Sequence, residues 1–268
     1  MKQVLSVQDL SCLGKCSLTL ALPVLSAMGC ACTPLPTAIL SSHTAFPGPH
    51  IRSLTGDILP ISTHLKTTGV QFDAISVGYL ADAGQAAAVE AVLDSFSAVK
   101  IIDPAMGDHG TLYSGLTEEH VSAMAQLCKK GNILLPNVTE AAMLTGLPYR
   151  EQAGPDYYAA LLEGMLAFGA DTVILTGACV HPEKTGFMGL CKKQGEFSYE
   201  ADRLPGKHHG TGDLFCAVFA GATVLGKSSP DAAVLAAKFV ETVIAAAPEP
   251  SPFGLEFEPQ LPWLQAHL

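Results

Sequence analysis

The sequence has few basic residues. Its 268 residues contain only 15 Lys and Arg against 25 Asp and Glu, and the formal net charge is -10. The basic residues form no run, so the composition argues against a nucleic-acid partner and favours a small molecule. There is also no uninterrupted stretch of about 18 apolar residues, the length that spans a bilayer, and no apolar signal-peptide core near the N-terminus. We therefore expect a cytoplasmic protein with no membrane partner.

The eight cysteines lack the spacing of a zinc site. Four of them, Cys12, Cys16, Cys30 and Cys32, lie close together in the sequence. Their spacings form neither a CxxC pair nor two such pairs at the distance found in zinc fingers. We expect reduced cysteines that pack as small apolar residues.

What the sequence does contain is short apolar runs alternating with longer amphipathic stretches. The runs at residues 3–7, 73–78, 99–104, 132–137 and 171–177 are bounded by turn residues, as buried strands are. The stretches at residues 83–96, 117–129 and 156–168 are long enough for crossover helices. This alternation predicts an α/β fold with a mostly parallel sheet covered on both faces.

The last third of the chain changes character. Residues 185–193 and 195–202 resemble an antiparallel pair at a sheet edge, and helices are expected at about 213–225 and 230–246. Because no linker-like composition and no internal repeat divides the chain, we expect one domain over residues 1–268. The Pro/Gly-rich segment 43–50 lies where mobile lids are often found, and we take lid closure as a hypothesis.

Polar side chains follow the predicted strands. In open α/β sheets, ligands bind beyond the carboxyl ends of the strands. The residues there are rich in carboxylates and amides, which suits a metal-bound polyanion and an organic acceptor: Gln8, Asp9, Tyr79, Asp103, Asp108, Asn137, Glu140 and Thr176.

Residues 221–228, GATVLGKS, match the phosphate-binding pattern GxxxxGK[ST]. That motif works only between a strand and a helix. Here a helical pattern precedes it, Gly226 is placed to end that helix, and Ser229-Pro230 resembles the start of the next. We interpret the match as a helix end followed by a helix start.

A second glycine-rich string, Gly210-Thr211-Gly212-Asp213, precedes an apolar helical pattern. Glycine permits close approach of a phosphate, and the free amides of a helix N-terminus carry partial positive charge. The string therefore predicts an anion hole for a transferred phosphoryl group. From spacing alone, Asp213 is either a favourable charge in the first helical turn or a base that takes a proton from an attacking hydroxyl.

The segment HGTGDLF resembles the C-terminal signature of the ribokinase-like superfamily, ATP-dependent kinases of small hydroxymethyl compounds. Within it, the chain is similar to the vitamin B6 kinases, especially the bacterial pyridoxal/pyridoxamine kinase branch. The similarity spans nearly the whole chain and includes, in order, QDLSCLGKCSLTLALPVLSAMG, PLPTAILSSHT, VGYLAD, DPAMGDHGTLY, PNVTEAAMLTG and GTGD. It implies a three-layer α/β/α fold and phosphorylation of the 5′-hydroxyl of pyridoxal, pyridoxine or pyridoxamine.

The resemblance also implies residue roles. Asp213 is the base, and Gly210, Thr211 and Gly212 form the anion hole, with Thr211 and Gly212 also contacting ATP. Other expected ATP contacts are Asp103, Asn137 and Thr176; Asp108 and Glu140 are the expected metal residues; Thr44 and Tyr79 contact the pyridine ring. Mg²⁺ with ATP as co-substrate and a homodimer are further implications.

Two departures bear on substrate and cation. Asp9 stands where well-known pyridoxal kinases carry serine, and a carboxylate there favours a protonated ring nitrogen or an exocyclic amine. Asp9 is thus an expected substrate contact, which fits a pyridoxamine or pyridoxine preference but also an aminopyrimidine. Leu135 stands where human-type enzymes place threonine, so a monovalent cation stays open. Two alternatives also remain: a hydroxymethylpyrimidine kinase of thiamin synthesis, and a non-catalytic vitamer or nucleotide sensor on the same fold.

Overall fold

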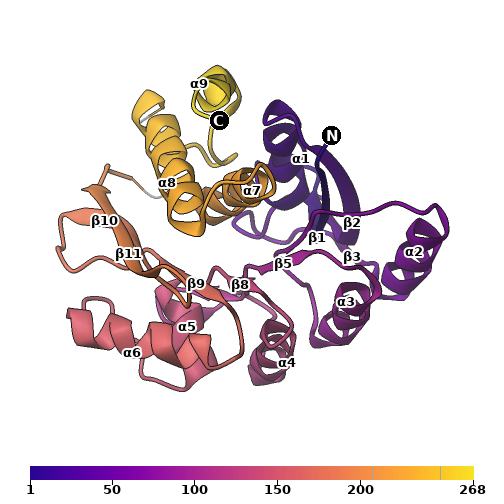
Figure 1. Ribbon diagram of the computed structural model, residues 1–268, viewed down its shortest axis with the longest axis horizontal. Coiled ribbons are helices and arrows are strands. Elements are labelled where there is room, and N and C mark those ends of the chain that lie inside the picture. Colours follow the sequence, from indigo (N-terminus) through magenta and orange to yellow (C-terminus); the bar gives the residue numbers. More distant parts are fainter. Residues whose placement is uncertain (207, 248) are drawn as a thin grey trace.

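The computed structural model describes residues 1–206, 208–247 and 249–268 (Figure 1). Its elements are β1 (Gln3–Ser11), α1 (Ser17–Ala27), β2 (Ala31–Leu40), β3 (Ile51–Ser53), α2 (Thr55–Thr67), β4 (Ala74–Val77), α3 (Ala83–Ser95), β5 (Val99–Ile102), β6 (Gly107–Asp108), β7 (Thr111–Leu112), α4 (Glu118–Cys128), β8 (Ile133–Leu134), α5 (Val138–Thr145), α6 (Pro155–Leu166), β9 (Thr172–Thr176), β10 (Lys184–Cys191), β11 (Gly195–Asp202), α7 (Thr211–Val224), α8 (Ser229–Ala246), a 3-10 helix (Glu258–Gln260) and α9 (Leu261–Ala266).

Nine strands form one sheet in the order β11-β10-β9-β8-β5-β4-β1-β2-β3. The six strands from β9 to β2 are parallel, whereas β10 and β11 at one edge and β3 at the other run antiparallel to their neighbours. The mostly parallel sheet with an antiparallel edge is therefore confirmed. Strands β6 and β7 form a separate small hairpin.

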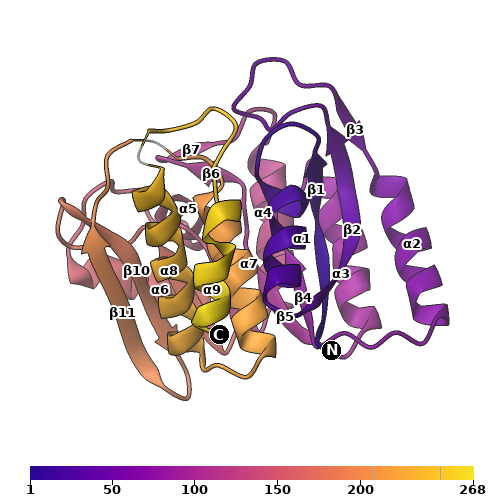
Figure 2. The ribbon, with the colours of Figure 1, turned by 90° about the horizontal axis from the view of Figure 1, so that it is seen from above.

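Helices cover both faces of the sheet, which gives three layers. Figures 1 and 2 show α1, α7, α8 and α9 on one face and α2 to α6 on the other. Side chains alternate across a strand, so adjacent residues pack into the hydrophobic cores on opposite faces of the sheet. Ile101 packs with the α1/α7/α8 layer and Ile102 with the α3/α4 layer. None of the described helices is long and apolar enough to cross a bilayer.

The two N-terminal strands differ from the sequence prediction. β1 continues to Ser11, so Asp9 lies inside the strand rather than after it, at a point where the β1–β2 pairing shifts from Gln8↔Pro36 to Leu10↔Ile39. We did not predict β2, whose Pro34 and Pro36 argue against a central strand. These prolines lie where β2 pairs with β1 alone, because β3 reaches only residues 38–40 of β2.

The GxxxxGK[ST] match is not a phosphate loop. Its first residues lie within α7, Gly226 has φ +96°, and the Lys227 amide donates to the carbonyl of Ala222 (3.0 Å), which closes the end of the helix. The next helix begins one residue earlier than expected, because Ser228 rather than Ser229 is its N-cap and accepts from the Asp231 amide (3.3 Å). The helix-end interpretation is confirmed.

Candidate active site

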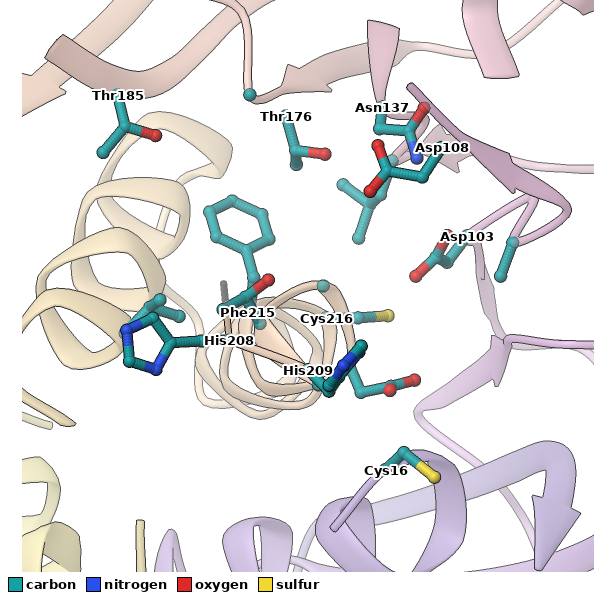
Figure 3. Close-up of a pocket in the computed structure, with 18 of the residues that line it drawn as sticks. Cys16, Asp103, Asp108, Asn137, Thr176, Thr185, His208, His209, Phe215 and Cys216 are labelled. Carbon is teal, nitrogen blue, oxygen red and sulfur yellow. The ribbon is translucent and has the colours of Figure 1, made fainter. Parts of the chain in front are cut away.

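One cavity of about 730 Å³ lies at the carboxyl ends of the parallel strands, beside the N-terminus of α7. All twelve residues singled out for a site role line it: Asp9, Thr44, Tyr79, Asp103, Asp108, Asn137, Glu140, Thr176, Gly210, Thr211, Gly212 and Asp213. Figure 3 shows Asp103, Asp108 and Asn137 on one wall, with Phe215 and Cys216 of α7 facing them. Gln8, inspected for the same reason, turns away and donates to Ser6 Oγ (2.9 Å).

Helix α7 starts at Thr211, two residues before the predicted start, so Asp213 is the third helical residue. Gly210 precedes the helix with φ +88°, and a Cβ there would lie 2.5 Å from the Lys15 carbonyl oxygen, so both conformation and space require glycine. Gly212 differs, because a Cβ there would meet nothing within 4 Å. The first amides of α7 have no partner within the helix and lie at the cavity, which makes them suitable for an anion.

Asp213 lies among other carboxylates. Burial, followed by the negative charge of Asp9, raises the pKa of Asp213 to about 7, against the lowering effect of the Ser17 amide. Burial likewise raises the pKa of Asp9, which is 3% exposed and accepts from Ser11 Oγ (3.0 Å). A carboxyl with a pKa near neutrality can accept a proton efficiently when it is ionised.

The wall opposite α7 is built around the N-terminus of α5. Asn137 caps this helix: its Oδ1 accepts from the Glu140 amide (2.9 Å), and its Nδ2 donates to the Gly107 carbonyl (2.8 Å). Glu140 is buried, with its oxygens accepting from the amides of Asn137 (2.8 Å) and Met106 (3.1 Å). These bonds fix the β5–β6 connection, which carries Asp103, against α5.

Like charges meet at this wall as well. Burial and the charge of Asp213 raise the pKa of Asp103 to about 8. Burial and the charge of Asp103 raise the pKa of Glu140, although its amide hydrogen bonds oppose the shift. Asp108 is exposed and pairs with the imidazole of His109 at 3.5 Å.

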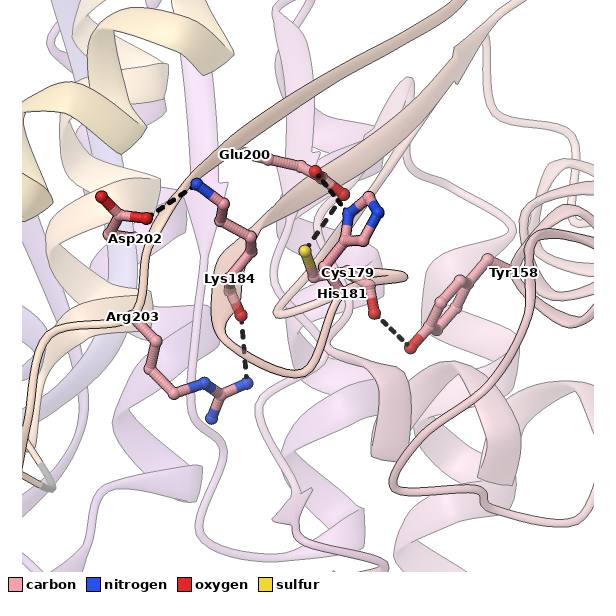
Figure 4. Close-up of polar contacts among 7 residues, drawn as sticks. All are labelled: Tyr158, Cys179, His181, Lys184, Glu200, Asp202 and Arg203. Carbon is pink, nitrogen blue, oxygen red and sulfur yellow. Dashed lines mark hydrogen bonds and ion pairs between the residues drawn. The ribbon is translucent and has the colours of Figure 1, made fainter.

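The cavity is strongly acidic. Seven carboxyl groups line it: Asp9, Asp103, Asp108, Glu140, Asp202, Asp213 and Glu241. Among the described lining residues, Arg203 supplies the one guanidinium, and no Lys is present. Figure 4 shows Arg203 donating to the Lys184 carbonyl (3.3 Å), beside the Lys184–Asp202 ion pair (2.7 Å). A polyanion therefore needs accompanying cations to bind here.

Two ends of the cavity differ in chemistry. The β1 end contains Asp9, Thr44 and Tyr79, and the charge of Asp9 contributes after burial to the raised pKa of Tyr79. The β10–β11 end is lined partly by apolar residues that the sequence analysis missed, namely Phe215, Ala237, Val240 and Ile244. They lie on α7 and α8, where apolar residues at helical spacing are indistinguishable in sequence from core residues.

Comparisons with known proteins agree with this architecture. A family model described as phosphomethylpyrimidine kinase matches residues 22–254. The pyridoxine/pyridoxal/pyridoxamine kinase of Bordetella avium is 30% identical over 261 residues, covering 90% of this chain and 84% of the relative. A Bacteroides thetaiotaomicron protein named as a phosphomethylpyrimidine kinase, crystallised with pyridoxal, is 33% identical and has a TM-score of 0.93, with 98% of this chain and 95% of that chain covered. The pyridoxal kinase of Lactobacillus plantarum is 29% identical, with a TM-score of 0.91 and 99% and 97% covered. The chain belongs to the phosphomethylpyrimidine kinase family, on the vitamin B6 kinase branch of the ribokinase-like superfamily.

Proposed function

We propose that the protein transfers the γ-phosphoryl group of ATP to the 5′-hydroxyl of a vitamin B6 vitamer, with Asp213 as the base. The observation that carries the proposal is the placement of Asp213, a carboxyl with a pKa of about 7, in the same helical turn as the free amides of Thr211 and Gly212. The hydroxyl proton passes to Asp213 while charge develops on the phosphoryl group beside these amides.

The β1 end suits the vitamer and the β10–β11 end suits the nucleotide base. Tyr79 offers a flat face for a pyridine ring, and Asp9 offers a carboxylate for its protonated nitrogen or amine. Phe215, Val240 and Ile244 offer apolar contact at the other end. This order brings the ATP phosphates to Gly210–Asp213, between the two ends.

The carboxylate oxygens fit Mg²⁺, which supplies charge neutralisation to the phosphates when bound. Mg²⁺ is usually held by one or two carboxylates together with substrate phosphates and water. No group of three or more such side chains is arranged as a metal site within the described residues, which is compatible with binding as the ATP complex. Asp103 and Asp108 present oxygens to the cavity, whereas Glu140 is committed to two backbone amides, so we assign it to shaping the wall.

Hydroxymethylpyrimidine is the second candidate acceptor. Asp9 favours it, since a carboxylate binds an aminopyrimidine as well as a pyridinium, and the family model carries the pyrimidine name. The similarity to B6 kinases favours the vitamers. ADP release measured with pyridoxal, pyridoxine, pyridoxamine and hydroxymethylpyrimidine decides between them. Activity with the pyrimidine alone would overturn our substrate assignment, and ligand stabilisation without any ADP release would indicate a binding protein.

The role of Asp213 is tested by Asp213→Asn. We expect the fold and ATP affinity to persist while kcat falls by about 10²- to 10⁴-fold, as loss of a proton acceptor predicts. Steady-state kinetics and ATP titration give the two quantities. Near-normal turnover in this variant would exclude Asp213 as the base.

A homodimer and a cytoplasmic location, both expected from the sequence, remain proposals. Sedimentation of the purified protein tests the first, and fractionation of the source cells tests the second.

A further inference from the structure

His43 lies in the β2–β3 connection, lines the cavity and is nearly enclosed. It is 7% exposed, and its backbone amide donates to the Leu13 carbonyl (3.0 Å). Its ring lies against Gly14, where an added Cβ would come within 2.0 Å of the ring Cδ2. The imidazole thus occupies the volume that a side chain at position 14 would need.

Both imidazole nitrogens have partners. Nδ1 accepts from the Ala45 amide (3.2 Å), and Nε2 lies 2.9 Å from the Pro252 carbonyl oxygen. Because Nδ1 is an acceptor, Nε2 carries the hydrogen and donates it to Pro252. One bond therefore stabilises the turn around His43, and the other ties that turn to the C-terminal segment, residues 251–258.

The C-terminal segment continues this connection to the anion hole. The Lys15 amide donates to the Phe253 carbonyl (2.8 Å), and the Lys15 carbonyl is the atom against which Gly210 packs. The His43 ring also lies 5.5 Å, centroid to centroid, from the ring of His209, which immediately precedes Gly210. Contacts thus run from the turn that carries Thr44 to the N-terminus of α7 by two routes.

We propose that His43 is a positioning residue that sets the place of Thr44, at the vitamer end, relative to the Gly210–Asp213 anion hole. In-line transfer requires the acceptor hydroxyl and the phosphoryl group to be aligned, and a misplacement of about 1 Å can cost about 100-fold. His43 transfers no proton in this role, since both its nitrogens are committed. The inference rests on the proposed function for the identity of the acceptor.

The two hydrogen bonds can be separated by substitution. In His43→Gln the side-chain amide nitrogen replaces Nε2 and keeps the tie to Pro252, whereas in His43→Asn the side-chain oxygen replaces Nδ1 and keeps only the bond from Ala45. We expect kcat/KM for the vitamer to fall about 10- to 100-fold in His43→Ala and His43→Asn and to recover in His43→Gln, while KM for ATP changes little. His50→Ala is the matched control, because His50 is exposed in the same connection and does not line the cavity.

Hydrogen exchange of residues 41–50 without ligands provides a readout independent of activity. Exchange should accelerate in His43→Ala and His43→Asn and stay at the wild-type rate in His43→Gln and His50→Ala. If the wild type phosphorylates no vitamer, the proposed function fails. Hydrogen exchange would still test whether the His43–Pro252 hydrogen bond holds the turn in place. Equal activity in the Asn and Gln variants, or a KM for ATP that rises as much as vitamer kcat/KM falls, would overturn the positioning role.

Gly14→Ala approaches the same contact from the other side, because its Cβ would displace the His43 ring. Gly14 has φ +105°, so alanine there also strains the backbone, and this cost to the free energy of unfolding is the same in both backgrounds. Beyond that shared cost, we expect Gly14→Ala to lower vitamer kcat/KM as His43→Ala does, and to lower it much less in a His43→Ala background. Additive losses would show that the two residues act separately and would contradict the proposal.

Discussion

At the scale of single residues, burial and then the negative charge of Asp9 raise the pKa of Asp213. Asp9 lies at the β1–β2 register shift, a kind of irregularity that often occurs beside active sites. Its charge contributes, after burial, to holding the pKa of Asp213 near 7. A cationic group on the substrate would neutralise Asp9, so substrate binding would favour the ionised form of Asp213.

This coupling predicts a shifted pH profile in Asp9→Asn. In the wild type, kcat/KM should rise with pH through about 7 as Asp213 loses its proton. Removing the charge of Asp9 lowers the pKa of Asp213, so the midpoint of the rise in kcat/KM should move to lower pH. This shift is expected even if the variant also binds the vitamer more weakly. Asp57→Asn, which removes an exposed charge on α2, should leave the midpoint in place. An unmoved midpoint in Asp9→Asn would refute the coupling.

At the scale of elements, the start of α7 combines two glycines with different reasons to be glycine. Gly210 allows the turn into the helix with its positive φ and its contact with Lys15. Gly212 has no such local requirement, since a Cβ there would meet only open space. The absence of a side chain at Gly212 is best explained by what approaches the helix from the cavity.

The two glycines therefore make a matched pair of variants. Gly210→Ala should lower the free energy of unfolding, by about 1 to 2 kcal/mol from the left-handed backbone alone. Gly212→Ala should leave thermal stability intact yet reduce kcat/KM for ATP, because its Cβ would stand in front of the anion-binding amides. Thermal unfolding and kinetics measured on both proteins separate these effects. Full activity in Gly212→Ala would argue that phosphate binds elsewhere.

At the scale of the whole molecule, the acidic cavity affects stability. The carboxyls of Asp9, Asp103, Glu140 and Asp213 all have raised pKa values in the fold, with burial as the main cause. A carboxyl whose pKa is higher in the folded state stabilises the fold below its unfolded pKa, and this contribution is lost as pH rises toward the folded pKa. For Asp103 the window runs from about 3.8 to about 8.

Asp103→Asn should consequently stabilise the ligand-free protein. We expect Tm to increase by at least about 2 °C at pH 8. The change should be smaller at pH 5, where the Asp103 carboxyl of the folded wild type is protonated. Differential scanning calorimetry at the two pH values tests this, with Asp57→Asn as control. A gain that does not depend on pH would point to packing rather than charge.

Much of the fold and site was predictable from local sequence. The short apolar runs predicted β4, β5, β8 and β9, and the glycine-rich string predicted a helix start, which the structure places at the cavity with Asp213 in its first turn. Strand β2 was missed because its two prolines argue against a strand. A strand accepts proline only where the proline has no neighbouring strand to donate to, and the pairing of β2 is known only from the tertiary structure. The apolar end of the cavity was missed because residues such as Val240 lie on a helix whose exposed and cavity-facing positions depend on how it packs.

The sequence by itself determined that strands alternate with helices, that a glycine-rich helix start carries a carboxylate, and that the ordered motifs are those of a kinase family. These features depend on neighbouring residues, so composition and spacing are enough to identify them. Only the tertiary structure decided that Asp9 and Asp213 share one enclosure, that Glu140 is committed to backbone amides, and that His43 contacts the C-terminal segment. Those facts depend on Coulomb interactions, burial and contacts between segments far apart in the chain, which exist only once the sheet has assembled.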